Sequence, residues 1–296
     1  MKQPNFFIVG APKCGTTALS AYLSEHPNIF FCSPKEPHYF ADDMAGHRPI
    51  SEIDAYLRLF SDAGPEHLAV GEGSVFYLYS STALKNIHQF CPTAKIIVMQ
   101  RNPVDLVQSL HLQYLHGLYE DEADFEKAWE LQEQRRLGRS IPRLCRQPEL
   151  LMYGDLGKLG AQMNRLYSIF PESQIKLIKF DDFVANTSTV YREVLKFLDI
   201  PDDGRSAFPP VNEAQGFRSP IAYHVARNTP AALRNLLSRL RFSRKFQTIP
   251  KMADRIFKTP AKKKPLSEGF RRQLEDYFSA DLELLNRLTM KHSNSR

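Results

Sequence analysis

The chain is poor in cysteine and lacks any long apolar segment. Its four cysteines lie far apart, at positions 14, 32, 91 and 145, and form no metal-ligand pattern. Because nothing else in the sequence indicates secretion, we interpret them as reduced thiols of a cytoplasmic protein. The longest apolar runs, such as residues 96–99, are far shorter than the roughly 20 residues that a membrane-spanning helix needs. The apolar stretch near the N-terminus is also too short for a signal peptide.

Compositional bias is absent from the chain as a whole. Hydrophobic residues make up 43% and charged residues 24% of the 296 residues, which excludes the disordered, collagen-like and coiled-coil classes. The charge is unevenly distributed, since residues 1–204 carry a net charge of −6 and residues 205–264 a net charge of +12. Such a basic block indicates contact with an anion, whether nucleic acid, phosphorylated ligand, sulfated polymer or membrane, or else a solvated basic face.

Short apolar runs alternate with segments of helical periodicity. We expect strands at residues 5–9, 29–32, 68–71, 95–100 and 174–180. We expect helices at residues 16–25, 53–60, 82–90, 103–119, 123–137, 153–170, 187–198 and 266–288. Strands that alternate with helices predict an α/β fold with a mainly parallel, helix-covered sheet.

The most informative segment is GAPKCGTT, residues 10–17, between an expected strand and an expected helix. Backbone N–H groups and the positive end of the helix converge in such a loop and favour anion binding. The segment resembles the nucleotide-binding loop GxxxxGK[ST], but Thr16 replaces the usual lysine and Lys13 lies within the loop. The alternative is a glycine- and proline-rich turn with an exposed lysine.

A second basic position follows the clearest expected strand. Residues 95–100 lead into Arg101, where a nucleoside triphosphatase would have an aspartate near its metal ion. Arg101 falls at the carboxyl end of a strand, where open α/β sheets bind ligands. Ser109 follows eight residues later, about two helical turns on, so both side chains are candidates for one phosphate.

Four motifs together resemble the sulfotransferases that use 3′-phosphoadenosine-5′-phosphosulfate (PAPS), in particular the bacterial and heparan-sulfate branches. They are FIVGAPKCGTTAL at residues 7–19, KEPHYF at 35–40, GEGS at 71–74 and IIVMQRNPVDLVQS at 96–109. The resemblance implies a P-loop-like, three-layer α/β/α domain with a central parallel sheet. We therefore expect one domain over residues 1–296, with a basic, variable segment at 205–264 and a C-terminal helix at 265–296.

The resemblance also implies a site for PAPS, with PAP as the product and no metal ion. The 5′-phosphosulfate would be held by the loop residues Lys13, Cys14, Gly15, Thr16, Thr17 and Ala18. Arg101 and Ser109 would hold the 3′-phosphate, and Arg218 in the basic block is the candidate for a late loop over that phosphate.

Sulfuryl transfer requires in-line placement and stabilisation of charge on the leaving oxygen. Lys13 is the candidate for that stabilisation, because a lysine near the leaving oxygen binds the transition state most strongly. Glu36 resembles the catalytic base of the heparan-sulfate branch, and His38 is its rival, since an imidazole titrates near neutrality. Both could instead be structural, Glu36 as a surface carboxylate paired with Lys35 and His38 as a packed histidine.

Two features bear on the acceptor, which we expect to be a hydroxyl or amine of a small molecule or carbohydrate. The heparan-sulfate enzymes carry a lysine where this chain has Gly73, so we expect one cation fewer near the sulfuryl group and a less polyanionic acceptor. The acidic run at residues 120–124 would favour a neutral or cationic acceptor if it bordered the acceptor cleft.

Other functions remain open at the level of the sequence. A P-loop kinase or nucleoside triphosphatase is disfavoured by Thr16 and by the missing strand-end aspartate. A non-enzymatic anion-binding module is supported by residues 230–246, where leucines on one helical face and arginines on others could contact a membrane. We favour the alternative, in which this helix packs over the acceptor cleft. Nucleic-acid binding has only charge in its favour, because no recognition motif is present, and we expect no nucleic-acid partner. The oligomeric state is not readable from the sequence.

Overall fold

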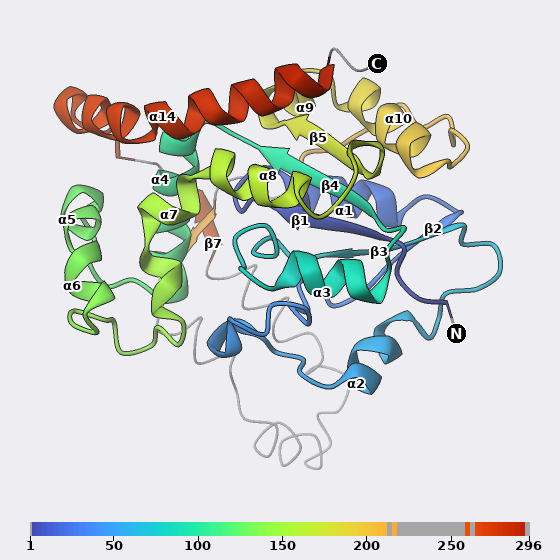
Figure 1. The fold of residues 1–296 in the computed structure, drawn as a ribbon, viewed down its shortest axis with the longest axis horizontal. Helices are drawn as coiled ribbons and strands as arrows, with labels where there is room; N and C mark the ends of the chain where they lie inside the picture. Colours follow the sequence, from blue (N-terminus) through green and yellow to red (C-terminus); the bar gives the residue numbers. More distant parts are fainter. Residues whose placement is uncertain (1, 212–214, 218–257, 261–263, 294–296) are drawn as a thin grey trace. The chain divides into compact units, whose positions relative to one another are not determined.

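The computed structural model describes residues 2–211, 215–217, 258–260 and 264–293. Arg218 and the segment 230–246 lie outside the described residues. The chain forms two compact units, which are described separately (Figure 1). The first comprises Met1–Gln108, Met152–Val211 and Ser267–Arg296, and the second Ser109–Leu151 and Asn212–Leu266. A single domain over residues 1–296 stays a prediction.

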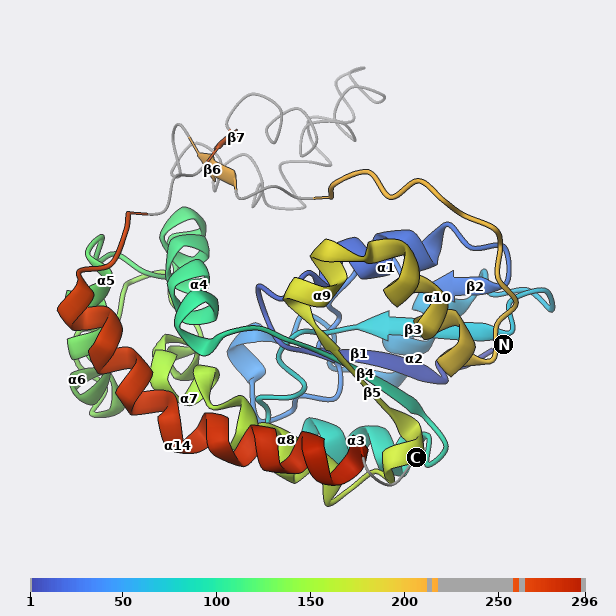
Figure 2. The same ribbon diagram turned by 90° about the horizontal axis from the view of Figure 1, so that it is seen from above.

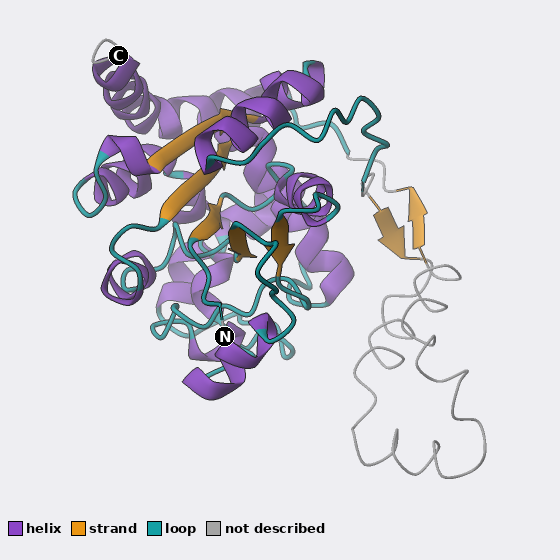
Figure 3. Ribbon diagram, turned by 90° about the vertical axis from the view of Figure 1, so that its right-hand side faces the viewer, coloured by secondary structure: helices purple, strands orange, loops and turns teal. Residues whose placement is uncertain are grey.

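The first unit is built around a five-stranded parallel sheet in the order β2-β3-β1-β4-β5. Figure 3 shows the strands of the sheet with helices around them. Its strands are β1 (Phe6–Gly10), β2 (Ile29–Phe31), β3 (Ala69–Gly73), β4 (Lys95–Gln100) and β5 (Ile175–Lys179). The central strand β1 is buried throughout, which explains its continuous apolar run, since helices cover both faces of a parallel sheet. In the register, Ile8 of β1 lies between Gly73 and Ile97.

Helices cover the sheet on both sides (Figure 2). One face carries α1 (Thr16–Ser24), α9 (Phe180–Ala185) and α10 (Thr187–Leu198). The other carries α3 (Ala83–Phe90), α8 (Leu159–Tyr167) and α14 (Glu268–Ser293). The apolar residues of α10 recur at helical spacing and are buried, as an amphipathic helix on a sheet requires. The predicted three-layer α/β/α fold with a central parallel sheet is confirmed.

The helix expected over residues 153–170 is wrong as a continuous element. The chain forms α7 (Tyr153–Gly157) and α8, with Lys158 between them in a non-helical conformation. The carboxylate of Asp281 in α14 accepts hydrogen bonds from the backbone N–H groups of Gly160 and Ala161, at 2.7 and 2.9 Å. A distant side chain therefore caps the new helix start, and no local pattern revealed it.

Shorter elements complete the first unit. The helix expected over residues 53–60 is α2 (Ile53–Leu57), which continues as a 3₁₀ turn at Arg58–Phe60. Further 3₁₀ turns lie at Ala45–His47 and Glu172–Gln174. Among the helices within the described ranges, none is long and apolar enough to cross a membrane.

The second unit contains several short helices among its described residues. The helix α4 (Pro103–Gly117) leads into it and is followed by α5 (Phe125–Glu130), α6 (Gln132–Arg136) and a 3₁₀ turn at Pro148–Leu151. A short antiparallel pair, β6 (Gln215–Phe217) and β7 (Lys258–Pro260), belongs to the same unit. The Arg135 guanidinium forms two hydrogen bonds with the Glu120 carboxylate, at 2.7 and 2.6 Å, and both side chains are fully buried.

Candidate active site

The loop between β1 and α1, residues 10–17, is the anion loop. Gly15 is the N-cap of α1 and has a φ of +86°, a left-handed conformation that suits glycine. A Cβ at this position would lie 3.2 Å from the Phe180 ring. No side chain caps α1, so its first N–H groups remain available to an anion. The predicted strand–loop–helix context of the anion loop is confirmed.

Two cations border the anion loop within the first unit. Lys13 lies in the loop with a φ of +62°, and Nη1 of Arg101 lies 3.5 Å from the Lys13 carbonyl oxygen. The Arg101 guanidinium also stacks over the Phe180 ring, 4.5 Å from its centroid. Burial and the nearby Arg101 charge lower the pKa of Lys13. Two adjacent positive charges in a partly desolvated loop favour an anionic ligand.

Two of the predicted loop residues contribute backbone rather than side chain. The Cys14 thiol is completely buried and donates to the Pro12 carbonyl at 3.3 Å, and burial raises its pKa to about 12. Ala18 lies in the first turn of α1, where its N–H donates to the Gly15 carbonyl. Cys14 can therefore offer a ligand only its backbone.

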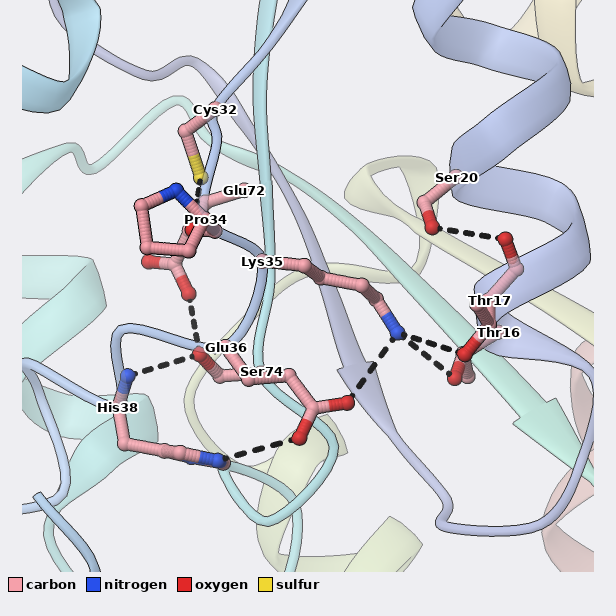
Figure 4. Close-up of polar contacts among 10 residues, drawn as sticks. All are labelled: Thr16, Thr17, Ser20, Cys32, Pro34, Lys35, Glu36, His38, Glu72 and Ser74. Atoms are coloured by element: carbon pink, nitrogen blue, oxygen red, sulfur yellow. Dashed lines mark hydrogen bonds and ion pairs between the residues drawn. The ribbon is translucent and has the colours of Figure 1, made fainter. Parts of the chain in front are cut away.

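Lys35 was not predicted as a site residue, yet its ammonium lies at the centre of the site (Figure 4). Nζ of Lys35 lies 3.2 Å from Oγ1 of Thr16, 3.4 Å from Oγ1 of Thr17 and 3.3 Å from Oε1 of Glu36. It thus connects the start of α1 to the segment KEPHYF (residues 35–40). The motif contained Lys35, but its spacing gave no indication of where the side chain points.

The KEPHYF segment brings Glu36 and His38 together. Oε2 of Glu36 lies 3.5 Å from Nε2 of His38. Burial opposes ionisation of Glu36, but its contacts with His38 and Lys35 outweigh burial and lower its pKa to about 2. The Glu36 side chain is 35% exposed and the His38 side chain only 4%. Glu36 therefore offers an ionised, accessible carboxylate, and His38 lies beneath it.

His38 is packed among aromatic rings. Its ring centroid lies 4.7 Å from that of His47 and 5.7 Å from that of Phe76. Burial and the neighbouring His38 lower the pKa of His47 to about 4, so this second imidazole is neutral at pH 7. These contacts agree with the packed-histidine alternative for His38, while its Nε2 still reaches Glu36.

The space beside Gly73 is occupied by Lys35. A Cβ built on Gly73 would lie 3.2 Å from Cε of Lys35 and 3.1 Å from the Phe31 ring. The Lys35 side chain therefore occupies the space beside Gly73, and its ammonium reaches the anion loop from there. The expectation of one cation fewer at this position stays a prediction, because Lys35 belongs to a motif on which the resemblance to the heparan-sulfate branch itself rests.

Three further predicted features belong to the second unit or lie outside the described residues. Ser109 belongs to the second unit and Arg218 is not among the described residues, so their roles stay predictions. In the acidic run, Glu120 forms a buried ion pair with Arg135. Asp124 caps α5 by accepting from two backbone N–H groups and also contacts Lys264 at 3.3 Å. Both carboxylates thus have structural partners.

Comparison with known proteins identifies the family of this site. The family model of the sulfotransferase domain matches residues 3–209, a region that contains the anion loop, the KEPHYF segment and Arg101. The chain belongs to the sulfotransferase family. Carbohydrate sulfotransferase 15 of Homo sapiens is 25% identical over 246 residues, covering 67% of this chain and 44% of the relative. The bifunctional heparan sulfate N-deacetylase/N-sulfotransferase 3 of Mus musculus is 27% identical over 215 residues, covering 67% and 22%.

The chain spans less than half the length of these curated relatives. A solved structure matches it over a larger share. The sulfotransferase from Alicyclobacillus acidocaldarius is 29% identical, covers 86% of this chain and 97% of its own, and superposes with a TM-score of 0.63. Within the described residues of this sulfotransferase-family chain, no group of three histidine, cysteine, aspartate or glutamate residues is arranged to hold a metal ion.

Proposed function

We propose that this protein transfers a sulfuryl group from PAPS to a hydroxyl or amine of a carbohydrate or small-molecule acceptor. The observation that carries the proposal is the position of the Lys35 ammonium, 3.2 Å from the Thr16 hydroxyl and 3.3 Å from the Glu36 carboxylate. It places an ionised carboxylate next to an anion-binding loop, which is the arrangement that deprotonation beside a bound phosphosulfate requires.

The residues present fit the phosphosulfate end of PAPS. The uncapped start of α1 leaves N–H donors for an anion. Lys13, Arg101 and Lys35 supply positive charge at the anion loop. In this proposal Lys13 through Ala18 hold the 5′-phosphosulfate, and Arg101, Ser109 and Arg218 hold the 3′-phosphate.

PAPS supplies the activated sulfuryl group. During transfer the bond from sulfur to the bridging oxygen breaks and a bond from sulfur to the acceptor atom forms, while the acceptor proton moves to the base. Negative charge accumulates on the leaving oxygen, and Lys13 stabilises it there. Lys35 stabilises the charge on the sulfuryl oxygens, since its ammonium lies between Thr16, Thr17 and the base.

Glu36 is the base in this proposal. Its pKa of about 2 leaves it ionised at neutral pH, and it is the more exposed of the two candidates. His38 lies below it with the Nε2 atom 3.5 Å from the carboxylate, so it orients Glu36. The second candidate mechanism follows from the same distance between Glu36 and His38, with the two groups acting together as the base.

The acceptor class follows from the family in coarse terms only. The names of the curated relatives include carbohydrate and heparan sulfate sulfotransferases, which supports a carbohydrate hydroxyl or amine here. The absence of a lysine at Gly73 still favours a less polyanionic acceptor within this class. A cytoplasmic location, expected from the free cysteines, belongs to the same proposal and is tested by cell fractionation.

A nucleotide-binding assay followed by a transfer assay tests the function. PAP without magnesium should raise the Tm of the protein in a thermal-shift experiment, whereas ATP with magnesium should not. Radiolabelled PAPS should then label acceptors in a panel of oligosaccharides, amino sugars, alcohols and amines. Stabilisation by ATP with magnesium, and none by PAP, would favour the kinase or nucleoside triphosphatase alternative and refute the proposal.

A further inference from the structure

The KEPHYF segment is attached to the end of β3 by three backbone hydrogen bonds. The N–H of Glu36 donates to the Gly73 carbonyl at 3.1 Å. The N–H of His38 donates to Oγ of Ser74 at 3.0 Å, and the N–H of Phe40 to the hydroxyl of Tyr77 at 3.2 Å. Two of these three acceptors are thus side-chain hydroxyls. The lone pairs of a hydroxyl face the segment only when its O–H bond has rotated away from the segment.

Both hydroxyls are fixed by the same carboxylate. Glu72 in β3 is completely buried, and its Oε1 accepts from Ser74 at 2.5 Å. Its Oε2 accepts from Tyr77 at 3.1 Å and from Tyr56 at 2.8 Å. Figure 4 shows the chain of contacts from Glu72 through Ser74 to His38. Of the three hydroxyls, only that of Tyr56 has no hydrogen bond to the KEPHYF segment among the contacts observed.

In its ionised form the Glu72 carboxylate can only accept hydrogen bonds, and this form fixes the direction of each bond in the network. The protons of Ser74 and Tyr77 must point towards Glu72, so their lone pairs point towards the N–H groups of His38 and Phe40. Without the carboxylate each hydroxyl could turn its proton towards the segment, where it would meet another donor. Glu72 therefore orients two of the three acceptors that hold the KEPHYF segment, the hydroxyls of Ser74 and Tyr77.

The segment needs such support because its backbone is strained. Glu36 and His38 have φ values of +64° and +48°, in the left-handed region that side chains with a Cβ rarely adopt. Residues held in this region persist only where the surroundings enforce them, and they concentrate at functional sites. The hydrogen bonds described above hold the backbone N–H groups of Glu36, His38 and Phe40, which are alternate residues of the segment. They therefore fix the backbone at the two residues that carry the candidate base and its neighbouring imidazole.

We propose that Glu72 is a positioning residue for sulfuryl transfer, which holds the KEPHYF segment through Ser74 and Tyr77 and so places Glu36 at the acceptor. This inference rests on the proposed function, in which Glu36 takes the acceptor proton. Glu72 itself contacts neither the anion loop nor Lys35 in the interactions observed. Its effect is on geometry, so it alters kcat rather than the binding of PAP.

Three single-hydroxyl deletions test the proposal. Ser74→Ala and Tyr77→Phe each cut a link from Glu72 to the segment, whereas Tyr56→Phe removes a hydroxyl from the same carboxylate without cutting a link. We expect all three to lower Tm, because each removes a buried hydrogen bond. We expect kcat to fall about ten-fold or more for Ser74→Ala and Tyr77→Phe and to stay within about two-fold for Tyr56→Phe. PAP affinity should stay unchanged in all three.

Amide hydrogen exchange of residues 35–40 gives a second readout that does not depend on activity. Exchange should accelerate in Ser74→Ala and Tyr77→Phe but not in Tyr56→Phe. An equal effect of all three variants on kcat and exchange would overturn the positioning role, as would unchanged exchange in Ser74→Ala. Lack of sulfuryl transfer by the unmodified protein would refute the proposed function instead, and the exchange pattern would still decide whether Glu72 holds the segment.

Discussion

The ammonium of Lys35 lies 3.2 Å from the hydroxyl oxygen of Thr16, although the two residues are 19 positions apart in the chain. Thr16 is the first residue of α1 and belongs to the anion loop, and Lys35 follows β2. The same ammonium contacts Glu36 at 3.3 Å and passes beside Gly73, which has no side chain to occupy that space. One lysine therefore links the anion-binding loop with the candidate base.

Lys35→Met should lower kcat about ten- to a hundred-fold, because it removes a positive charge from the point where the sulfuryl oxygens lie in the proposed function. Lys35→Arg should retain part of the activity. The matched control is Lys176→Met, since Nζ of Lys176 makes an exposed pair with Glu193 at 2.6 Å, outside the site. Steady-state transfer from radiolabelled PAPS measures the effect, and an unchanged kcat in Lys35→Met would rule out this role.

Lys13→Ala should reduce sulfuryl transfer by roughly a hundred- to a thousand-fold, the loss typical of removing one stabilising group from a developing oxyanion. PAP binding should weaken much less, because the N–H groups of the anion loop remain. The comparison of kcat with the dissociation constant of PAP, measured by calorimetry, checks both parts. Retention of full activity would show that another group stabilises the leaving oxygen.

Glu36→Gln should lower kcat by roughly a hundred-fold or more, and His38→Ala by less, if Glu36 is the base. Burial opposes its ionisation, but the contacts with His38 and Lys35 lower the pKa of Glu36 to about 2. The base is then ionised throughout the neutral range, so protonation of Glu36 itself should not lower kcat as the pH falls from about 8 to about 5. A decline in that range, abolished by His38→Ala, would identify His38 as the base.

Glu72 should make stability depend on pH. Burial outweighs its three hydroxyl donors and raises its pKa from 4.5 to about 7. Because the folded state binds this proton more tightly, its stabilisation is full below pH 4.5 and is lost as the pH rises through about 7. The free energy of unfolding of the wild type, relative to Glu72→Gln, should therefore fall by on the order of 2 kcal/mol from about pH 5 to about pH 9.

Urea unfolding at several pH values measures this dependence for Glu72. Glu133→Gln is the control, since the Glu133 side chain is 84% exposed and its replacement should leave the pH dependence unchanged. A constant difference in stability between the wild type and Glu72→Gln across this range would show that Glu72 is ionised throughout.

Asp281→Ala should destabilise the first unit by about 0.5–2 kcal/mol, the usual value of a helix cap. The Asp281 carboxylate accepts from the N–H groups of Gly160 and Ala161 at the start of α8. Asp276→Ala, at an exposed position of the same helix, is the control. Chemical denaturation compares the two, and an equal effect would mean that the cap contributes nothing to stability.

Much of the fold was predictable because its strands are short, apolar and bounded by polar or turn residues. The strand at residues 95–100 and the helix at residues 187–198 have the predicted bounds, since their burial patterns agree with their local sequence. The helix expected over residues 153–170 failed because its interruption is capped by Asp281, more than a hundred positions away. Local periodicity carries no information about such a partner.

The sequence by itself determined the elements and the chemistry of the anion loop. Gly15 between a buried strand and a helix leaves an uncapped helix start, and this depends only on neighbouring residues. It also determined the family, through the anion loop and the KEPHYF segment. Both features are local, because each is a short run of consecutive residues that can be recognised directly in the sequence.

Only the tertiary structure decided which side chains share the site. The parallel pairing of β1 with β3 sets Ile8 beside Gly73, and this register brings the KEPHYF segment to the anion loop. Lys35 reaches Thr16 and Glu72 collects the hydroxyls of Ser74, Tyr56 and Tyr77 for that reason. Such contacts depend on strand order and burial, because these bring together residues that are distant in the sequence. No local spacing of residues in the sequence indicates them.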